Sequence, residues 1–169
     1  MATTNVDADL AGDVDTMRST TGFAIMYYGG IISYMSKLQS TVALSTPEAE
    51  TNAAVEAVKQ ICHTRLFLKE LGCEQKYPTL MYEDNNATIS FSEGSESSKR
   101  TKYYQMKVHF LREKRDVDYI MRKAATVDQL ADVFTKALPS ETYSKFRRWM
   151  GVVQGPVIGD DAPKNELGC

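Results

Sequence analysis

The N-terminal part of the chain carries the hydrophobic pattern of three β-strands. Residues 5–10 alternate between apolar and polar side chains, as in a strand with one buried face. Residues 22–28 form an apolar and aromatic run that predicts a second strand, and residues 31–35 predict a third. The Gly29-Gly30 pair between them predicts a hairpin turn, and residues 11–15 a turn before them. The chain therefore begins with three antiparallel strands.

After these strands the apolar spacing changes to three and four residues, which predicts a long helix ending near Leu71. Ser45 or Thr46 can cap its first turn, and Pro47 suits an early helical position because its missing N–H costs nothing there. Ser45 and Glu48 also fit a capping box. The apolar stripe of this helix contains Ala53, Ala54, Ala57, Val58 and Ile61.

The two glutamates at the start of this helix point in different directions. At about 100° per residue, Glu50 lies on the apolar stripe, whereas Glu48 lies about 200° away, towards solvent. A buried carboxylate is costly unless something pairs with it, so a metal ion or a basic partner is implied. The alternative is that Glu50 reaches water from the first turn, where the helix dipole favours a negative charge.

In the second half of the chain, helices alternate with two further strands. Asp84 is placed either to end the fourth strand or to cap the next helix, and Thr126 with Gln129 fits a capping box. The order of elements predicts an α/β fold, with a five-stranded mixed sheet, three antiparallel strands first, flanked by helices. The expected elements are strand 79–82, helices 87–91 and 101–114, strand 117–121, helix 130–137 and a last helix from residue 139.

Length and composition are those of one globular domain. The 169 residues include 43% hydrophobic and 25% charged residues, enough for a substantial core. We expect a domain over residues 1–153 and a disordered tail over residues 154–169, which is rich in glycine, proline and acids. The net charge of −2 provides no global positive field, so any nucleic-acid binding must use local patches.

Cysteine and histidine usage excludes several other kinds of site. The three cysteines are odd in number and lack the CxxC spacing, which argues against a disulfide framework and against a zinc site. Two histidines are too few for a histidine-rich metal centre. No apolar run approaches the length of about 20 residues that a membrane span needs. We therefore expect no membrane association and an intracellular location, in the cytoplasm or the nucleus.

Three carboxylates are expected to converge if the first and fourth strands are neighbours. Asp7 lies in the first strand, Asp84 ends the fourth, and Glu50 begins the helix that covers the sheet. Ligands gather at the ends of adjacent strands in such sheets. Asp9 shares a strand face with Asp7, so the strand pattern alone does not choose between them.

The same residues lie in motifs that resemble the ribonuclease H domain of copia-type LTR retrotransposon Pol polyproteins. The resemblance covers roughly residues 5–153, with the motifs in the family's order. The matching segments are 7–13 (DADLAGD), 18–22 (RSTTG), 36–50 (SKLQSTVALSTPEAE), 84–85 (DN), 100–102 (RTK), 109–113 (HFLRE) and 128–139 (DQLADVFTKALP).

The resemblance implies four catalytic carboxylates that hold metal: Asp7, Glu50, Asp84 and Asp132. The helical-face argument selects Glu50 independently. The choice of Asp7 over its neighbour on the strand rests on the resemblance alone. Asp132 is expected on a late helix, where Asp128 shares its face four residues earlier.

The implied activity is that of a metal-dependent endonuclease that cleaves the RNA strand of RNA–DNA hybrids. Two Mg²⁺ ions about 3.5–4 Å apart, which Mn²⁺ can replace, would activate a water and stabilise the charge on the attacking and leaving oxygens. The hybrid is the implied partner, with reverse transcriptase and integrase of a parent element as further candidates. The sugar-phosphate backbone of the hybrid would contact a local basic patch. The alternative is that these basic residues only make a loop more soluble. The patch contains Lys99, Arg100, Lys102 and Lys107.

Several positions depart from the family's pattern around the four acids. The family usually has an aromatic residue at Thr51, histidine at Tyr103 and aspartate at Gln105. A metal site whose ligands lack their usual supporting residues is often much less active. The alternative function is therefore a catalytically weak or inert remnant that binds nucleic acid or protein. No lysine is matched to the site, so we expect the metal-free acids to repel one another.

Overall fold

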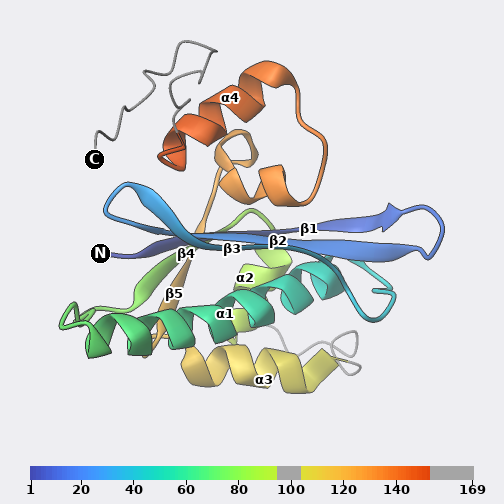
Figure 1. The fold of residues 1–169 in the computed structure, drawn as a ribbon. Coiled ribbons are helices and arrows are strands. Elements are labelled where there is room, and N and C mark those ends of the chain that lie inside the picture. Colours follow the sequence, from blue (N-terminus) through green and yellow to red (C-terminus); the bar gives the residue numbers. More distant parts are fainter. Residues whose placement is uncertain (95–103, 153–169) are drawn as a thin grey trace, which may run out of the picture.

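The computed structural model describes residues 1–94 and 104–152. The predicted tail and the predicted loop residues Lys99, Arg100 and Lys102 lie outside this part of the chain. Figure 1 shows a central sheet with helices on both sides. The strands are β1 (Thr3–Asp13), β2 (Arg18–Tyr27), β3 (Gly30–Leu38), β4 (Thr79–Glu83) and β5 (Tyr119–Lys123). The α-helices are α1 (Thr46–Glu70), α2 (Asn86–Glu93), α3 (Gln105–Lys114) and α4 (Ser140–Trp149).

The five strands form one mixed sheet in the order β3-β2-β1-β4-β5. The first three strands pair antiparallel, whereas β4 is parallel to both β1 and β5. This arrangement confirms the predicted α/β class and the predicted mixed sheet. It also makes β1 and β4 neighbours, which is the condition for bringing Asp7 and Asp84 together.

The first predicted turn is wrong because β1 continues to Asp13. Ala11 adopts a left-handed conformation with φ of 53°, and the pairing register shifts between Asp9 and Asp13. A bulge of this kind absorbs extra residues within a strand, so the chain turns only after it. The second turn also lies one residue earlier than predicted, at Tyr28-Gly29.

Helix α1 begins as the sequence predicts. The Ser45 hydroxyl caps it by accepting the backbone N–H of Glu48 at 3.4 Å. The Glu48 carboxylate in turn accepts the N–H of Leu44 at 3.0 Å, one residue before the position that a capping box uses. The apolar stripe packs on the sheet, and the largest buried cluster of the molecule lies there. Its members on the helix include Ala53, Ala54, Ala57, Val58 and Ile61.

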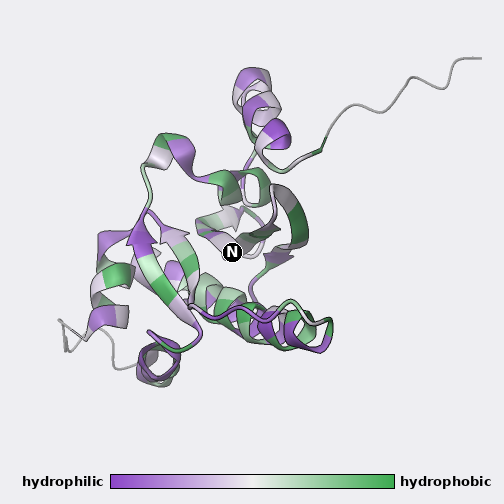
Figure 2. Ribbon diagram, turned by 90° about the vertical axis from the view of Figure 1, so that its left-hand side faces the viewer, coloured by the Kyte–Doolittle hydropathy of each residue, from purple (hydrophilic) through white to green (hydrophobic). Residues whose placement is uncertain are grey.

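The two faces of the sheet are covered by different parts of the chain. In Figure 1, α1 and α3 lie on one side of the sheet and α4 on the other. Ala24 on β2 packs with Phe146 and Met150 in a second buried cluster on the α4 side. Figure 2 shows hydrophobic and hydrophilic colours alternating around the helices, as expected for elements with one buried face.

The helix predicted over residues 130–137 is wrong. Two short 3₁₀ helices, η2 (Thr126–Asp128) and η3 (Leu130–Phe134), occupy this region. The fully buried Gln129 side chain donates to the Val6 carbonyl at 2.9 Å and accepts the N–H of Ala131 at 3.4 Å. Because the Gln129 amide is engaged with β1, it cannot close the predicted capping box. The segment is held against the sheet instead of continuing as an α-helix.

No helix in residues 1–94 and 104–152 combines the length and the apolarity that crossing a membrane requires. Within the same residues, Cys62 and Cys73 are both free.

Gly22→Ala is expected to destabilise the protein by about 1–3 kcal/mol, because the new methyl group has no space. It would lie 2.5 Å from the Thr135 methyl carbon and 3.0 Å from both the Ala131 carbonyl oxygen and the Phe134 Cβ. Gly30→Ala is the matched control, since its nearest neighbour would be 4.0 Å away. Urea denaturation of both variants checks this; equal stabilities would show that η3 does not pack tightly on β2.

Candidate metal centre

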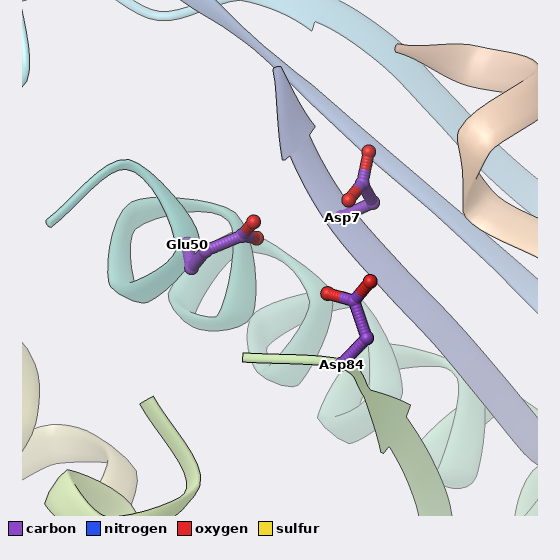
Figure 3. A group of neighbouring side chains, drawn as sticks. All are labelled: Asp7, Glu50 and Asp84. Carbon is purple, nitrogen blue, oxygen red and sulfur yellow. The ribbon is translucent and has the colours of Figure 1, made fainter. Parts of the chain in front are cut away.

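Three carboxylates from distant parts of the sequence meet where β4 ends beside β1. Asp7 comes from the middle of β1, Glu50 from the first turns of α1, and Asp84 directly follows β4. One carboxylate oxygen of each lies within 4.8 Å of the others. Figure 3 shows the three side chains directed towards one another. Asp7 and Glu50 are each only 3% exposed, so the alternative in which Glu50 reaches water is wrong.

Asp84 can take part in this cluster because its neighbour Asn85, and not Asp84 itself, caps α2. The Asn85 side chain accepts the backbone N–H groups of Ala87 at 2.9 Å and Thr88 at 3.2 Å. The alternative in which Asp84 is the cap is therefore wrong, and its carboxylate is available to the cluster. The Lys123 ammonium donates to the backbone carbonyl of Asp84, which ties this turn to the end of β5.

Asp132 lies beside Asp7 rather than within the three-acid cluster. The Lys136 ammonium lies 2.9 Å from Asp132 Oδ1 and 3.8 Å from Asp7 Oδ2. The Thr135 hydroxyl also donates to Asp7 Oδ2, at 2.5 Å. Asp128, which sequence spacing placed on the same face, instead pairs with Lys145 at 2.8 Å.

The expectation that no lysine compensates the acids is wrong. Lys136 faces both Asp7 and Asp132, and its position four residues after Asp132 was a signal in the sequence for this pair. That signal could not show that the lysine also reaches β1, because the contact depends on how η3 packs on the sheet.

A further acid, Glu83, was missed by the sequence analysis. It is fully buried at the end of β4, and its Oε1 accepts the N–H of Asn85 at 2.9 Å. Its Oε2 has no hydrogen-bond partner among the described residues. Strand alternation was the available signal, since Glu83 shares a strand face with the buried Thr79 and Met81.

Burial and mutual repulsion disfavour the charged forms of these acids. The pKa of Glu50 is raised to about 10, mainly by burial and in addition by the carboxylates of Glu83, Asp7 and Asp84. Burial also raises the pKa of Asp132 to about 6, although the ion pair with Lys136 opposes this increase.

The same causes act on the remaining groups. Burial raises the pKa of Asp7, while Thr135 and Lys136 lower it. Burial raises the pKa of Glu83 well above its usual range. For Lys136, burial lowers the pKa, but the hydrogen bond to Asp132 and the nearby carboxylates raise it overall. Within residues 1–94 and 104–152, the site therefore has fewer positive groups than acids.

The donor set fits a hard divalent cation. Carboxylate oxygens are the ligands that Mg²⁺ and similar ions prefer in proteins. The Oε2 atom of Glu50 is buried and has no hydrogen-bond partner among the described residues. A buried acceptor of this kind needs a partner, and a cation at the three-acid cluster would provide one.

The predicted basic patch is represented in the structure by Lys107 alone. Its ammonium donates to the Asn52 side chain at 2.7 Å, and Asn52 in turn donates to Gln39 at 2.9 Å. Lys107 lines a groove beside α1 together with Lys37 and Lys59. The structure thus brings together lysines that the sequence analysis did not associate.

The residues that depart from the family's pattern have their own places in the local structure. The Thr51 hydroxyl is buried and donates to the Pro47 carbonyl at 2.6 Å. Gln105 begins α3, while Tyr103 lies outside the described residues.

Comparison with curated proteins identifies the relatives of this chain. It is 39% identical over 147 residues, 86% of the chain, to the Retrovirus-related Pol polyprotein from transposon TNT 1-94 of Nicotiana tabacum. The chain is a homologue of transposon Pol polyproteins. A second relative, the Retrovirus-related Pol polyprotein from transposon RE2 of Arabidopsis thaliana, is 31% identical over 151 residues, 89% of the chain. The Pol homologue spans 11% and 10% of these polyproteins. No family model matches it.

Solved structures show that this Pol homologue has the ribonuclease H fold. LC11-RNase H1, isolated from compost, superposes with a TM-score of 0.61 at 14% identity, covering 85% of this chain and 96% of that protein. The same protein has been solved with an RNA/DNA hybrid, and that structure gives a TM-score of 0.60 at 13% identity, covering 80% and 94%. These likenesses confirm the predicted fold.

Proposed function

We propose that this chain is a divalent-metal-dependent endonuclease that cleaves the RNA strand of RNA–DNA hybrids. The observation that carries the proposal is the convergence of Asp7, Glu50 and Asp84, with carboxylate oxygens within 4.8 Å of one another. The ribonuclease H fold and the homology to Pol polyproteins support the same proposal. Asp132, beside Asp7, completes the proposed set of four acids.

The four acids would hold Mg²⁺, with Mn²⁺ as a substitute, at up to two positions. The bound ions would activate a water molecule and stabilise the charge on the attacking and leaving oxygens. Glu50, Asp84 and Asp7 would hold the first ion, and Asp7 with Asp132 would hold the second. Thr135 donates a hydrogen bond to Asp7 Oδ2, which would hold this oxygen on the side of Lys136, the residue that also contacts Asp132.

The proposed substrate is a hybrid because the fold is that of a protein solved with an RNA/DNA hybrid. Ribonucleotides would be distinguished by their 2′-hydroxyls in the wide minor groove. Lys107 and the groove that it lines would contact the backbone, together with Lys99, Arg100 and Lys102. Since the chain matches only a segment of its relatives, reverse transcriptase and integrase of a parent element are proposed as further partners.

A binding module without activity is the second candidate. It is favoured by the ion pairs of Lys136 with Asp7 and Asp132, because an ammonium group can neutralise these acids without any metal. The departures at Thr51 and Gln105 point the same way, since misplacing a reacting group by about 1 Å can lower a rate about a hundredfold.

A cleavage assay separates the two candidates. The full chain is incubated with a hybrid labelled on its RNA strand, in Mg²⁺, in Mn²⁺ and in EDTA, with double-stranded DNA as control substrate. We expect slow nicking of the RNA strand in either metal, none in EDTA, and little action on DNA. Hybrid binding without cleavage in any metal would favour the binding module.

A further inference from the structure

Lys136 occupies the space between two of the proposed metal ligands. Its ammonium lies 2.9 Å from Asp132 Oδ1 and 3.8 Å from Asp7 Oδ2, while both carboxylates are buried. The Lys136 side chain is 40% exposed, so it enters this position from the solvent side. One positive charge thus already bridges the acids on the side of Asp7 that faces η3.

Among the described residues, no cation bridges the three-acid cluster of Asp7, Glu50 and Asp84 as Lys136 bridges Asp7 and Asp132. Lys136 and Thr135 both contact the Oδ2 atom of Asp7. The buried Oε2 atom of Glu50, a member of the cluster, has neither a hydrogen-bond partner nor an ion pair among the described residues. Lys123 contacts the backbone carbonyl of Asp84. One side of the Asp7 carboxylate is therefore neutralised by a lysine, and no lysine or arginine of the described residues pairs with the other side.

We propose that Lys136 is a tethered cation that holds the position between Asp7 and Asp132, so that the protein alone binds one divalent ion. That ion binds at Asp7, Glu50 and Asp84, and a second ion enters only when the Lys136 side chain leaves. This inference rests on the proposed function, since it concerns the same carboxylates.

Physical chemistry favours competition between the ammonium group and a second ion. Both would use oxygens of Asp7 and Asp132, and two like charges at that separation repel strongly in a partly buried site. The backbone N–H of Lys136 donates to the Asp132 carbonyl at 3.1 Å, which holds the lysine near its partner. Its flexible four-carbon stem lets the ammonium leave, and a substrate phosphate would offer it another partner.

The number of ions bound in the absence of substrate tests the proposal. Isothermal titration of the full chain with Mn²⁺ is expected to give one ion per wild-type chain. Lys136→Met and Lys136→Gln should each give two, because the competing charge is gone. Lys136→Arg should restore one, and Lys136→Met combined with Asp132→Asn should also return to one. Circular dichroism establishes which variants are folded.

The outcomes separate this inference from the proposed function. Two ions in the wild type would overturn the role of Lys136 while leaving the metal-dependent function intact, and this result needs no variant. One ion in a folded Lys136→Met or Lys136→Gln chain would also overturn it. No Mn²⁺ binding to the wild type would count against the proposed metal site itself. One ion in the wild type and two in either variant would establish the tethered cation.

Discussion

Replacement of Asp7 by Asn, or of Glu50 by Gln, is expected to lower cleavage of the RNA strand by at least about a hundredfold to a thousandfold. Each change keeps the shape of the side chain but removes a carboxylate that would be ionised when a metal ion is bound. The remaining acids would hold a cation less tightly and out of place, so the charge that develops during phosphodiester cleavage would lose most of its stabilisation. Initial rates on a labelled hybrid at saturating Mg²⁺ measure the loss.

Matched substitutions separate this effect from a general effect of charge. Asp9→Asn removes an acid from the same strand as Asp7, and Glu48→Gln removes one from the same helix turn as Glu50. Neither residue belongs to the cluster of carboxylates, so both variants are expected to cleave at close to the wild-type rate. Cleavage that survives both Asp7→Asn and Glu50→Gln, or that persists in EDTA, would show that another nuclease is responsible.

The unfolding free energy of the metal-free protein is expected to fall as pH rises from about 5 to 8. The pKa of Glu50 is raised from its ordinary value of 4.5 to about 10 in the folded state. Between these values the folded protein keeps a proton that the unfolded chain releases, so stability is highest at low pH and decreases with pH. Each such proton contributes a slope of about 1.4 kcal/mol per pH unit.

Asp132 acts in the same direction over a narrower range, since its pKa rises from 3.8 to about 6. A divalent ion should oppose the trend, because it binds the ionised acids and stabilises only the folded state. Mg²⁺ is therefore expected to raise the melting temperature more at pH 8 than at pH 5. Urea denaturation in EDTA and thermal melting in Mg²⁺, each across this pH range, make the measurement.

Two variants serve as controls for the pH experiment. Glu50→Gln should reduce the dependence of stability on pH without abolishing it, since one group with a raised pKa is gone while Glu83 and Asp132 still titrate in the same direction. Asp84→Asn should remove the stabilisation by Mg²⁺ while lowering stability less than a core substitution, or even raising it, because it relieves repulsion in the cluster. Stability of the metal-free wild type that rises with pH would contradict the electrostatic account of the site.

Local periodicity specifies much of this fold. The first three strands and the long helix α1 (Thr46–Glu70) follow from apolar spacings of two and of three to four residues. Side chains that are close together in the sequence define these spacings. The direction of Glu50 follows from the same helical geometry, and the structure confirms it. These features were predictable because the interactions that specify them are close in sequence.

Features that depend on distant contacts were not predictable in the same way. Gln129 was interpreted as part of a capping box, but its amide binds the Val6 carbonyl, 123 positions away in the sequence. Such a contact forms only when η3 lies against β1, and it overrides the local preference for a helix. Strand alternation likewise could not distinguish Asp7 from Asp9, because residues two positions apart lie on the same face of a strand.

The amino-acid sequence alone was enough to predict the class of fold, the helix that carries Glu50 and, through its motifs, the resemblance that selected the four acids. Which charges share a site became clear only from the tertiary contacts. They add the buried Glu83 behind the cluster and place Lys136 between Asp7 and Asp132. The physical reason is that electrostatic coupling depends on distance and burial in space, and neither quantity is a property of spacing along the chain.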